Sequence, residues 1–299
     1  MKVLLISDKP NWAYSTIANA IIKYNKSDIL FSHLNCKKDL SKIKNTYKEY
    51  DYFFVLGWQN LVLLPFLDKH RVLTGVHSHQ SFDQKQTTPE SDFAPSKNTI
   101  DFLGKFRAVN TVSKRLYNLL IKNGLSITYT PNGVDTNFFI PGKRNNSFII
   151  SSASASKNDW NKGVKEFIIP VCQTLSFPVI YADGKLKHTD MVRFYNSSHC
   201  YVCMSKSEGM SLSVLEAASC GCIIISTECG DIKELINHEQ NGFIIERSKD
   251  ELTRTINKIC FNRELINIFQ EKIRETVVKS WDWSKRVDLW VDFIRGNCN

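Results

Sequence analysis

The sequence predicts an α/β protein built from two Rossmann-like, doubly wound domains. Three observations lead to this prediction: the length, the alternation of strand-like and helix-like segments, and an uneven distribution of charge. A chain of 299 residues can bury one large core or two ordinary ones, and typical domain sizes of about 100–200 residues favour two. With 42% hydrophobic and 23% charged residues, the composition is that of a folded globular protein.

Six apolar, strand-like runs fall in the first half of the chain. They are KVLLIS (2–7), DILFSHL (28–34), DYFFVLG (51–57), RVLTGVH (71–77), FRAVNTVS (106–113) and SITYTP (126–131). Helical patterns lie between them, at 15–24, 38–50 and 113–124, and the last ends at a glycine that suits a helix C-cap. Strands that are apolar on both faces and alternate with helices indicate a parallel sheet covered on both sides.

The second half repeats this alternation. Its strand-like runs are SFIISSAS (147–154), FPVIYA (177–182), HCYVCMS (199–205), GCIIIST (221–227) and GFII (242–245). Between the halves lies TPNGVDTNFFIPGKRNNS (130–147), whose Pro, Gly and Asn content indicates a linker. We therefore expect domains at 1–143 and 144–280, followed by a C-terminal segment, 281–299. In that segment an apolar stripe near helical spacing predicts a packed helix: Trp283, Val287, Trp290 and Phe293.

Positive charge is concentrated in the first half. Residues 1–145 hold 20 Lys/Arg and 11 Asp/Glu, whereas residues 146–299 hold 19 of each. Two helix-like segments carry clusters of basic residues: Lys37, Lys38, Lys42, Lys44 and Lys48 in one, and Lys114, Arg115 and Lys122 in the other. Two interpretations stay open, a solvated lysine-rich face or a surface that meets an anionic membrane. A nucleic-acid-binding protein is an alternative of a different class, but no helix-turn-helix, zinc-finger or RNP-like pattern occurs, so we do not expect nucleic acid as a partner.

The cysteines favour a reduced, cytoplasmic protein. The chain has nine of them, and its start shows neither a long apolar h-region nor a cleavage site, so we expect no secretory signal. Cys200 and Cys203 fall in one strand-like run, and Cys220 and Cys222 adjoin the next. Strand positions three apart face opposite sides of a sheet, so the pattern favours buried structural cysteines over a metal site.

The stretch SEGMSLSVLEAASCGCIIIS (207–226) places two carboxylates, Glu208 and Glu216, eight positions apart. If HCYVCMS is a strand and SLSVLEAAS a helix, KSEGM is a strand-to-helix loop at the ligand-binding edge of a sheet. The amides near Gly209, Met210 and Ser211 would then lie at a helix N-terminus, which attracts phosphate. The simpler alternative is a helix-start acid that complements the dipole and an ordinary surface acid. Dehydrogenase and P-loop functions are excluded because neither G-x-G-x-x-G nor G-x-x-x-x-G-K-[ST] occurs.

This stretch resembles the Glu–seven residues–Glu motif of the retaining GT-B glycosyltransferases of family 4 (glycosyl transferases group 1). Four other segments match in the family's order: AVNTVSKRLYNLL (108–120), TPNGVDTNFF (130–139), NKGVKEF (161–167) and ISTECGDIKELINHEQNGFII (225–245). The resemblance covers about residues 71–245. It implies an N-terminal acceptor domain and a C-terminal nucleotide-sugar domain that face a cleft, with the last helix crossing back onto the N-terminal domain.

The resemblance also implies an activity. The enzyme would move a sugar from a nucleotide-sugar donor to a glycan or lipid-linked acceptor with retention of the anomeric configuration. It would need no metal or other cofactor. It would be cytoplasmic, and peripheral on the inner face of a membrane where its acceptor is lipid-linked. A GT-B sugar-nucleotide epimerase or hydrolase shares the donor site and stays an alternative.

Residue roles follow from the same resemblance. Glu208 would contact the transferred sugar and Glu216 the ribose. The amides of the next residues would bind the sugar or diphosphate: Gly209, Met210, Ser211 and Leu212. Lys162 and Lys157 match two diphosphate clamps, although the family has Arg where Lys157 stands. His77, with His79 as a competing candidate, matches a catalytic histidine of the N-terminal domain beside the donor sugar.

Two features of the first half depart from this pattern or extend it. The family's first strand–helix turn carries glycines, whereas SDKPNWAYS (7–15) has none and places Trp12 and Tyr14 there. The longest polar stretch, 78–98, directly follows His77. A loop of that length is either functional or disordered.

Overall fold

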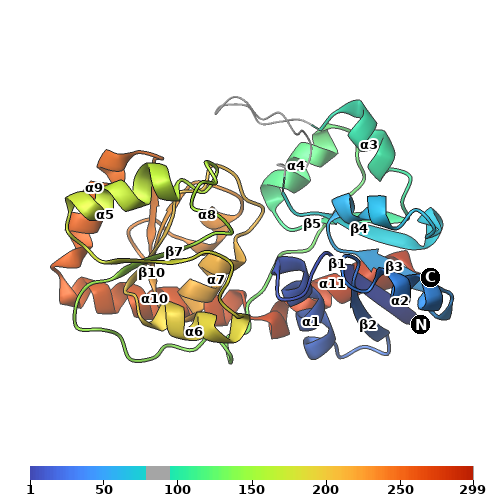
Figure 1. Ribbon diagram of the computed structural model, residues 1–299, viewed down its shortest axis with the longest axis horizontal. Helices are drawn as coiled ribbons and strands as arrows, with labels where there is room; N and C mark the ends of the chain where they lie inside the picture. The colour runs from blue at the N-terminus through green and yellow to red at the C-terminus, as the bar shows by residue number, and fades with distance from the viewer. Residues whose placement is uncertain (79–94, 299) are drawn as a thin grey trace. The chain divides into compact units, whose positions relative to one another are not determined.

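The computed structural model describes residues 1–78 and 95–298, which form two compact units (Figure 1). One unit comprises Met1–Asn132 and Trp283–Asn299, and the other comprises Gly133–Asp282. Most of the predicted polar loop (78–98) lies within residues 79–94, outside the described residues. His79 lies there too.

The chain divides earlier than the expected boundary after residue 143. The reason is that residues 133–140 pack into the second unit. The Val134 N–H donates to the Trp281 carbonyl at 2.8 Å, and Arg274 donates to the carbonyls of Thr136 and Phe139, each at 2.8 Å. These bonds attach the expected linker to the unit that follows it.

The first unit contains a six-stranded parallel sheet in the order β2-β1-β3-β4-β5-β6. Its strands are β1 (Lys2–Ser7), β2 (Leu30–Asn35), β3 (Tyr52–Val55), β4 (Val72–Val76), β5 (Ala108–Thr111) and β6 (Thr128–Tyr129). Its α-helices are α1 (Ala13–Tyr24), α2 (Leu40–Thr46), α3 (Lys97–Leu103), α4 (Lys114–Lys122) and α11 (Trp283–Asn297), joined by 3₁₀ turns η1 (Tyr47–Glu49), η2 (Trp58–Leu63) and η3 (Lys69–Arg71).

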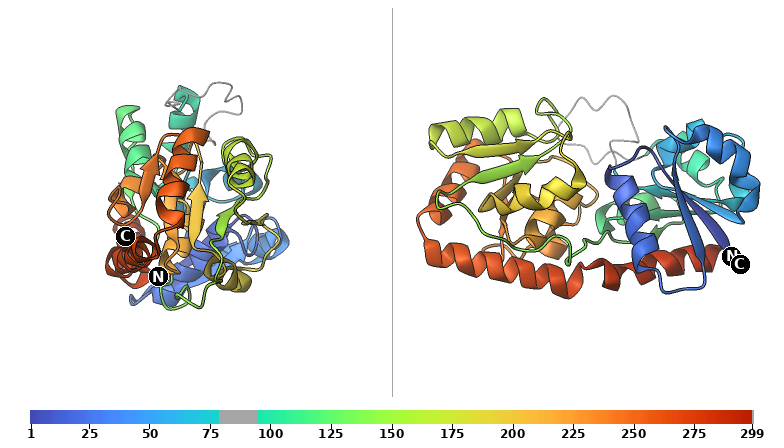
Figure 2. Two further views of the ribbon diagram at one scale, coloured as in Figure 1. Left: turned by 90° about the vertical axis from the view of Figure 1, so that its left-hand side faces the viewer. Right: turned by 60° about the horizontal axis from the view of Figure 1, so that its bottom comes forward.

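Helix α11 is part of the core of the first unit. It lies beside α1 (Figure 2), and all four residues of its expected apolar stripe are buried. The Phe54 ring of β3 packs on Trp290 and Phe293, at centroid distances of 5.9 and 5.6 Å. The Trp290 indole N–H donates to the Pro131 carbonyl at 2.9 Å. Burial of these large aromatic side chains is what holds the C-terminal helix in this unit.

The second unit contains a five-stranded parallel sheet in the order β11-β10-β9-β7-β8. Its strands are β7 (Ile150–Ala153), β8 (Val179–Ala182), β9 (Cys200–Cys203), β10 (Ile223–Thr227) and β11 (Phe243–Ile245). Its helices are the π-helix η5 (Val164–Ile168), α5 (Ile169–Thr174), α6 (His188–Asn196), α7 (Leu212–Ser219), α8 (Ile232–Leu235), α9 (Lys249–Cys260) and α10 (Arg263–Ser280).

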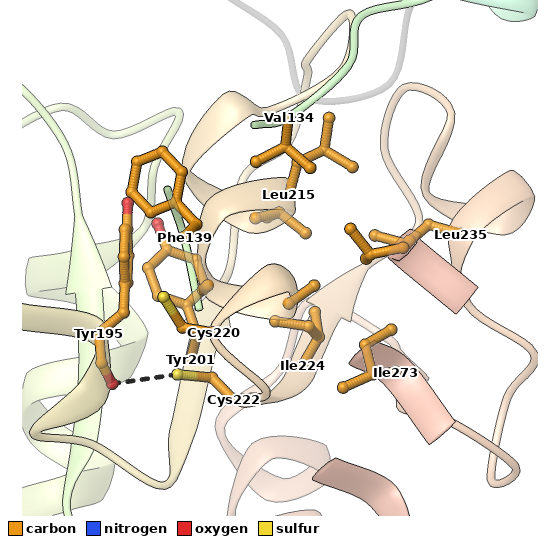
Figure 3. Packing of buried hydrophobic residues seen from close by; sticks show 14 of the residues in the cluster. Val134, Phe139, Tyr195, Tyr201, Leu215, Cys220, Cys222, Ile224, Leu235 and Ile273 are labelled. Atoms are coloured by element: carbon orange, nitrogen blue, oxygen red, sulfur yellow. Dashed lines mark hydrogen bonds between the residues drawn. The ribbon is translucent and has the colours of Figure 1, made fainter. Parts of the chain in front are cut away.

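Both faces of the second sheet are buried, as the apolar strand runs predict. Along β9, Cys200 and Val202 enter a core shared with α5 and α9. Tyr201 and Cys203 enter a second core, shared with α6, α7 and α10 (Figure 3). Cys200 and Cys203 therefore face opposite sides of the sheet, which confirms their interpretation as structural cysteines. All nine cysteines lie among the described residues, and all are free thiols.

The α/β class is confirmed, and each of the eleven strand-like runs overlaps a strand. In the described part of the chain, no helix is long and apolar enough to cross a membrane. Within the same residues, no group of three or more His, Cys, Asp or Glu side chains could hold a metal ion.

Candidate active site

The candidate site lies where the second sheet reverses its strand order. Strand β7 is flanked by β8 on one side and β9 on the other, so the chain leaves the ends of β7 and β9 in opposite directions. In open α/β sheets, ligands bind outside the carboxyl ends of the strands at such a point. Two loops meet there: residues 154–163, which follow β7, and residues 204–211, which follow β9.

Lys162 and Glu208 join these two loops through a close ion pair. Their side chains are 26% and 16% exposed, so the pair is shielded on the inside and open on one side. Burial by itself would lower the pKa of Lys162, but the adjacent Glu208 carboxylate outweighs it and raises that pKa. Lys162 therefore keeps its positive charge at the edge of the sheet.

Asn161 holds the two loops in register. Its amide group donates to the Ser207 carbonyl at 3.0 Å, and its Oδ1 accepts the Ser207 N–H at 3.0 Å. The Asn161 carbonyl accepts the Lys206 N–H at 2.8 Å. Asn161 is 2% exposed. The residues directly before Lys162 and Glu208 are thus hydrogen-bonded to each other, which fixes the geometry of the ion pair.

Gly163 and Arg247 complete this support. Gly163 has φ +64°, and a Cβ there would lie 2.9 Å from the Met204 carbonyl oxygen, so only glycine fits. The Arg247 guanidinium donates to the carbonyls of Met204, at 2.8 Å, and Trp160. The π-helix η5 begins directly after Gly163. π-Helical turns are rare and recur at functional sites.

Helix α7 begins at Leu212, so residues 209–212 lead into its N-terminus, as expected. The 228–231 loop packs against this turn: the Asp231 N–H donates to the Gly209 carbonyl at 3.1 Å. A Cβ at Gly230 would lie 1.9 Å from that same carbonyl oxygen. The close approach fixes the turn that carries Glu208, Gly209 and Met210.

Glu216 lies inside the second unit and is 8% exposed. The Tyr195 hydroxyl donates to its Oε2 at 2.8 Å, and the Nε2 atom of His188 lies 3.4 Å from its Oε1. Both partners belong to α6. The Glu216 carboxylate raises the pKa of His188, although burial opposes this effect. Glu216 is therefore a held, buried carboxylate, and the alternative of an ordinary surface acid does not apply to it.

Lys157 lies on the loop after β7, on its exposed part. Its ammonium group sits 4.9 Å from the centroid of the Tyr181 ring, and the Tyr181 hydroxyl donates to the Ser154 carbonyl at 2.9 Å. The structure thus pairs Lys162 with Glu208 directly and holds Lys157 over an aromatic ring on β8.

His77 follows β4 in the first unit, with its ring between Tyr14 and Trp290 at centroid distances of 5.1 and 6.0 Å. A Cβ at Gly75 would lie 2.4 Å from its Nε2 and 2.6 Å from Oδ1 of Asn110. The ring therefore folds back over Gly75, and Nε2 points into the unit. Burial lowers the pKa of His77 to about 3, so the ring is uncharged at neutral pH.

Sequence reasoning missed four residues of this site: Asn161, Arg247, His188 and Tyr195. Their contacts join positions between 21 and 87 residues apart, and no local pattern marks such contacts. Gly163 gives a partial signal, because a glycine after a lysine at the start of a helical segment indicates a backbone constraint.

Several known proteins are similar to parts of this chain. The profile of the family Glycosyl transferases group 1 matches residues 180–276, which contain Glu208, Glu216 and α6. One subunit of the phosphatidylinositol N-acetylglucosaminyltransferase of Arabidopsis thaliana is 27% identical over 210 residues, which are 58% of this chain and 46% of that protein. The UDP-Gal:alpha-D-GlcNAc-diphosphoundecaprenol alpha-1,3-galactosyltransferase of Escherichia coli is 25% identical over 214 residues, 57% of this chain and 55% of that protein.

An uncharacterized glycosyltransferase of Haemophilus influenzae is 29% identical over 102 residues, 31% of this chain and 29% of that protein. The chain thus spans between 29% and 55% of the length of these curated relatives. The matched family model and the names of these relatives are all those of glycosyltransferases.

Solved structures establish the fold. HepE of Anabaena, crystallised with UDP-glucose, aligns with a TM-score of 0.71 at 13% identity and covers 99% of this chain and 100% of that one. Sucrose-phosphate synthase of Thermosynechococcus elongatus aligns with a TM-score of 0.73 at 14% identity, over 99% and 98% of the two chains. The chain has the fold of the GT-B glycosyltransferases, as the sequence predicts.

Proposed function

We propose that this chain is a retaining glycosyltransferase that moves a sugar from a nucleotide-sugar donor to a glycan or lipid-linked acceptor without a metal. The observation that carries the proposal is the Lys162–Glu208 ion pair at the reversal point of the second sheet. Buried Glu216 follows on the next helix. The ion pair lies on the two loops before η5 and α7, and Glu216 lies about one turn further along α7.

This set of groups suits the charges of glycosyl transfer. As the bond between the anomeric carbon and the diphosphate breaks, negative charge builds on the diphosphate and positive charge on the sugar. Lys162 would neutralise the diphosphate together with the amides at the start of α7. Glu208 would accept hydrogen bonds from the sugar hydroxyls and stabilise the positive charge that develops on the ring.

The remaining donor contacts follow from the same arrangement. A carboxylate accepts a pair of hydroxyl hydrogen bonds well, so Glu216 would bind the ribose diol. Lys157, which is exposed on the same loop as Lys162, would supply a second positive charge to the diphosphate. Two lysines and the helix amides would do the work that a divalent cation does in other transferases. His77 would act as a neutral residue of the acceptor unit.

The names of two similar proteins suggest the first substrates to test. The Escherichia coli relative is named for UDP-Gal and a diphosphoundecaprenol acceptor, and HepE was crystallised with UDP-glucose. A lipid-linked acceptor would bring the enzyme to a membrane. The lysine-rich surface, Lys37, Lys38, Lys42, Lys44 and Lys48, is exposed, and Lys44 lies 5.9 Å from the Phe66 ring centroid. Val62, four residues before Phe66, is 78% exposed. A cationic surface and an exposed apolar residue in the same unit suit an anionic membrane surface.

A thermal-shift screen against UDP-, GDP- and ADP-sugars tests the donor class. A donor at 100-fold its Kd should stabilise the protein by about 2.7 kcal/mol. NMR of the anomeric proton in the product then tests retention. Stabilisation by none of these nucleotide sugars, or a product of inverted configuration, would contradict the proposal. Transfer that stops on addition of EDTA would contradict metal independence.

A further inference from the structure

Helix α6 holds the carboxylate of Glu216 from both sides. Tyr195, near the end of that helix, donates its hydroxyl to Oε2 at 2.8 Å. His188, the first residue of the helix, places Nε2 3.4 Å from Oε1. The two partners are seven positions apart, which is about two turns, so both side chains project from one face of α6.

Neighbouring aromatic residues fix the ring of His188. It stacks on Phe138, with the planes 5° apart and the centroids at 5.4 Å, and it meets Phe139 edge-on at 5.2 Å. The Nε2 atom is buried, and its contact with Glu216 is an ion-pair distance without regular hydrogen-bond geometry, while the side chain as a whole is 34% exposed. The ring is therefore held with one nitrogen at the carboxylate and another edge open.

We propose that His188 is a positioning residue of the donor site: when protonated, it pairs with Glu216 and holds that carboxylate for the ribose, so donor affinity depends on the protonation of His188. The inference rests on the proposed function, because it takes Glu216 as the ribose-binding group. The family match and the sequence pattern assign no role to His188.

The charges around the ring give the direction of the effect. Glu216 of α7 faces Nε2, and Asp135, on the segment that also carries Phe138 and Phe139, is a second carboxylate whose charge reaches the ring. The Tyr195 hydroxyl stays neutral because burial and the charge of Glu216 raise its pKa well above the ordinary value. With His188 neutral, Glu216 leaves an uncompensated negative charge at the ribose end of the donor, which is itself an anion. With His188 protonated, that charge is cancelled.

The sign of the pH dependence follows from the raised pKa of His188. The Glu216 carboxylate is its main cause, and burial opposes it. The His188 charge is therefore fully present below the ordinary histidine pKa of about 6.5 and is lost as the pH rises through the raised value. Donor binding should be tightest on the acid side of neutrality and weaken toward alkaline pH.

The test measures the Kd of a nucleotide sugar by calorimetry between pH 5.5 and 8.5. The probe is whichever of UDP-glucose, GDP-mannose and ADP-glucose binds most tightly. The diphosphate diesters of all three do not titrate in this pH range, so the ligand itself adds no pH dependence. The wild-type Kd should rise about 3- to 10-fold across the range, as expected for one linked proton. His188→Gln keeps an amide donor but cannot titrate, so its Kd should be nearly constant. His188→Phe, which keeps a ring to stack on Phe138, should behave in the same way.

His238→Gln is the matched control. The Nε2 atom of His238 lies 3.8 Å from a carboxylate of Glu239, and the side chain is 51% exposed, so a similar His–Glu contact is removed elsewhere in the same unit. This variant should keep the wild-type pH profile. If His188→Gln or His188→Phe kept the wild-type pH dependence of Kd while Glu216→Gln weakened donor binding, the role of His188 alone would be overturned. Failure of the wild type to bind all three probes would overturn the proposed function and this inference with it.

Discussion

Replacing Asn161 by alanine should loosen the loop that carries Glu208 while leaving both sheets intact. The change removes two hydrogen bonds, both at 3.0 Å, between the buried Asn161 side chain and the backbone of Ser207. The bond from the Lys206 N–H to the Asn161 carbonyl at 2.8 Å does not involve the side chain, so it remains. Asn161→Ala therefore isolates the contribution of the side-chain clamp.

The magnitude follows from the number of bonds. A typical intramolecular hydrogen bond contributes a net ~0.5–1.5 kcal/mol, so the free energy of local opening should fall by about 1–3 kcal/mol. Because about 1.4 kcal/mol corresponds to a factor of ten, the amides of residues 206 and 207 should exchange with solvent roughly 5- to 150-fold faster. Hydrogen exchange followed by mass spectrometry measures this change, in the regime where exchange reports the opening equilibrium.

Asn158→Ala is the control, because Asn158 is an exposed residue of the same loop. Surface substitutions away from special features change stability by only about 0.5 kcal/mol or less. Peptides from the first unit should exchange at wild-type rates in both variants. If Asn161→Ala and Asn158→Ala gave equal exchange at residues 206 and 207, Asn161 would not hold the two loops together.

Three further predictions concern other parts of the chain. Gly163→Ala should lower the free energy of unfolding, measured by urea titration, by ~1–3 kcal/mol more than Gly124→Ala does. Both glycines have positive φ, but only a Cβ at 163 would meet a neighbour, the Met204 carbonyl oxygen at 2.9 Å. Equal effects of the two substitutions would contradict this. Burial lowers the pKa of His77 to about 3, so the unfolded state binds more protons than the folded state between about pH 6.5 and 3. The stability of the wild type should therefore fall on acidification through this window, and that of His77→Phe should fall less. Parallel stability curves for the two proteins would refute this prediction. Wild type should cosediment with anionic but not neutral vesicles at low salt, and a Lys37/Lys38/Lys42→Glu triple variant should not; equal pelleting of the two proteins would leave only a solvated face.

The sequence predicts the sheets well because strands that are apolar on both faces carry their signal locally. Each run of β-branched and aromatic residues in the second unit, such as GCIIIST, has no soluble alternative to burial between helices. The apolar stripe of Trp283, Val287, Trp290 and Phe293 is likewise visible in the sequence and buried in the structure. The boundary between the units is not visible, because residues 133–140 look like a linker and yet are bound by Arg274, more than 130 positions away.

The residues of the candidate site likewise divide into those that a local motif predicts and those that distant contacts place. Glu208, Glu216 and Lys162 are predicted from motifs that resemble those of the family, because each of these motifs is local in the sequence. The orientation of His77 is not, because it depends on the space left by Gly75 and on the rings of Tyr14 and Trp290. Tyr14 stands where a glycine is expected, and its ring packs against Gly57, where a Cβ would lie 2.5 Å from it. Such compensation between distant positions cannot be deduced from a local pattern.

The most direct test of the proposed chemistry compares Glu208→Gln with Glu216→Gln in one steady-state assay. Release of nucleoside diphosphate from the donor, with water or an acceptor as the second substrate, gives kcat and the donor KM. If Glu208 acts on charge that develops in the transition state, Glu208→Gln should lower kcat on the order of 10²- to 10³-fold with little change in KM. If Glu216 holds the ribose throughout, Glu216→Gln should mainly raise KM. Wild-type turnover by Glu208→Gln would contradict the account.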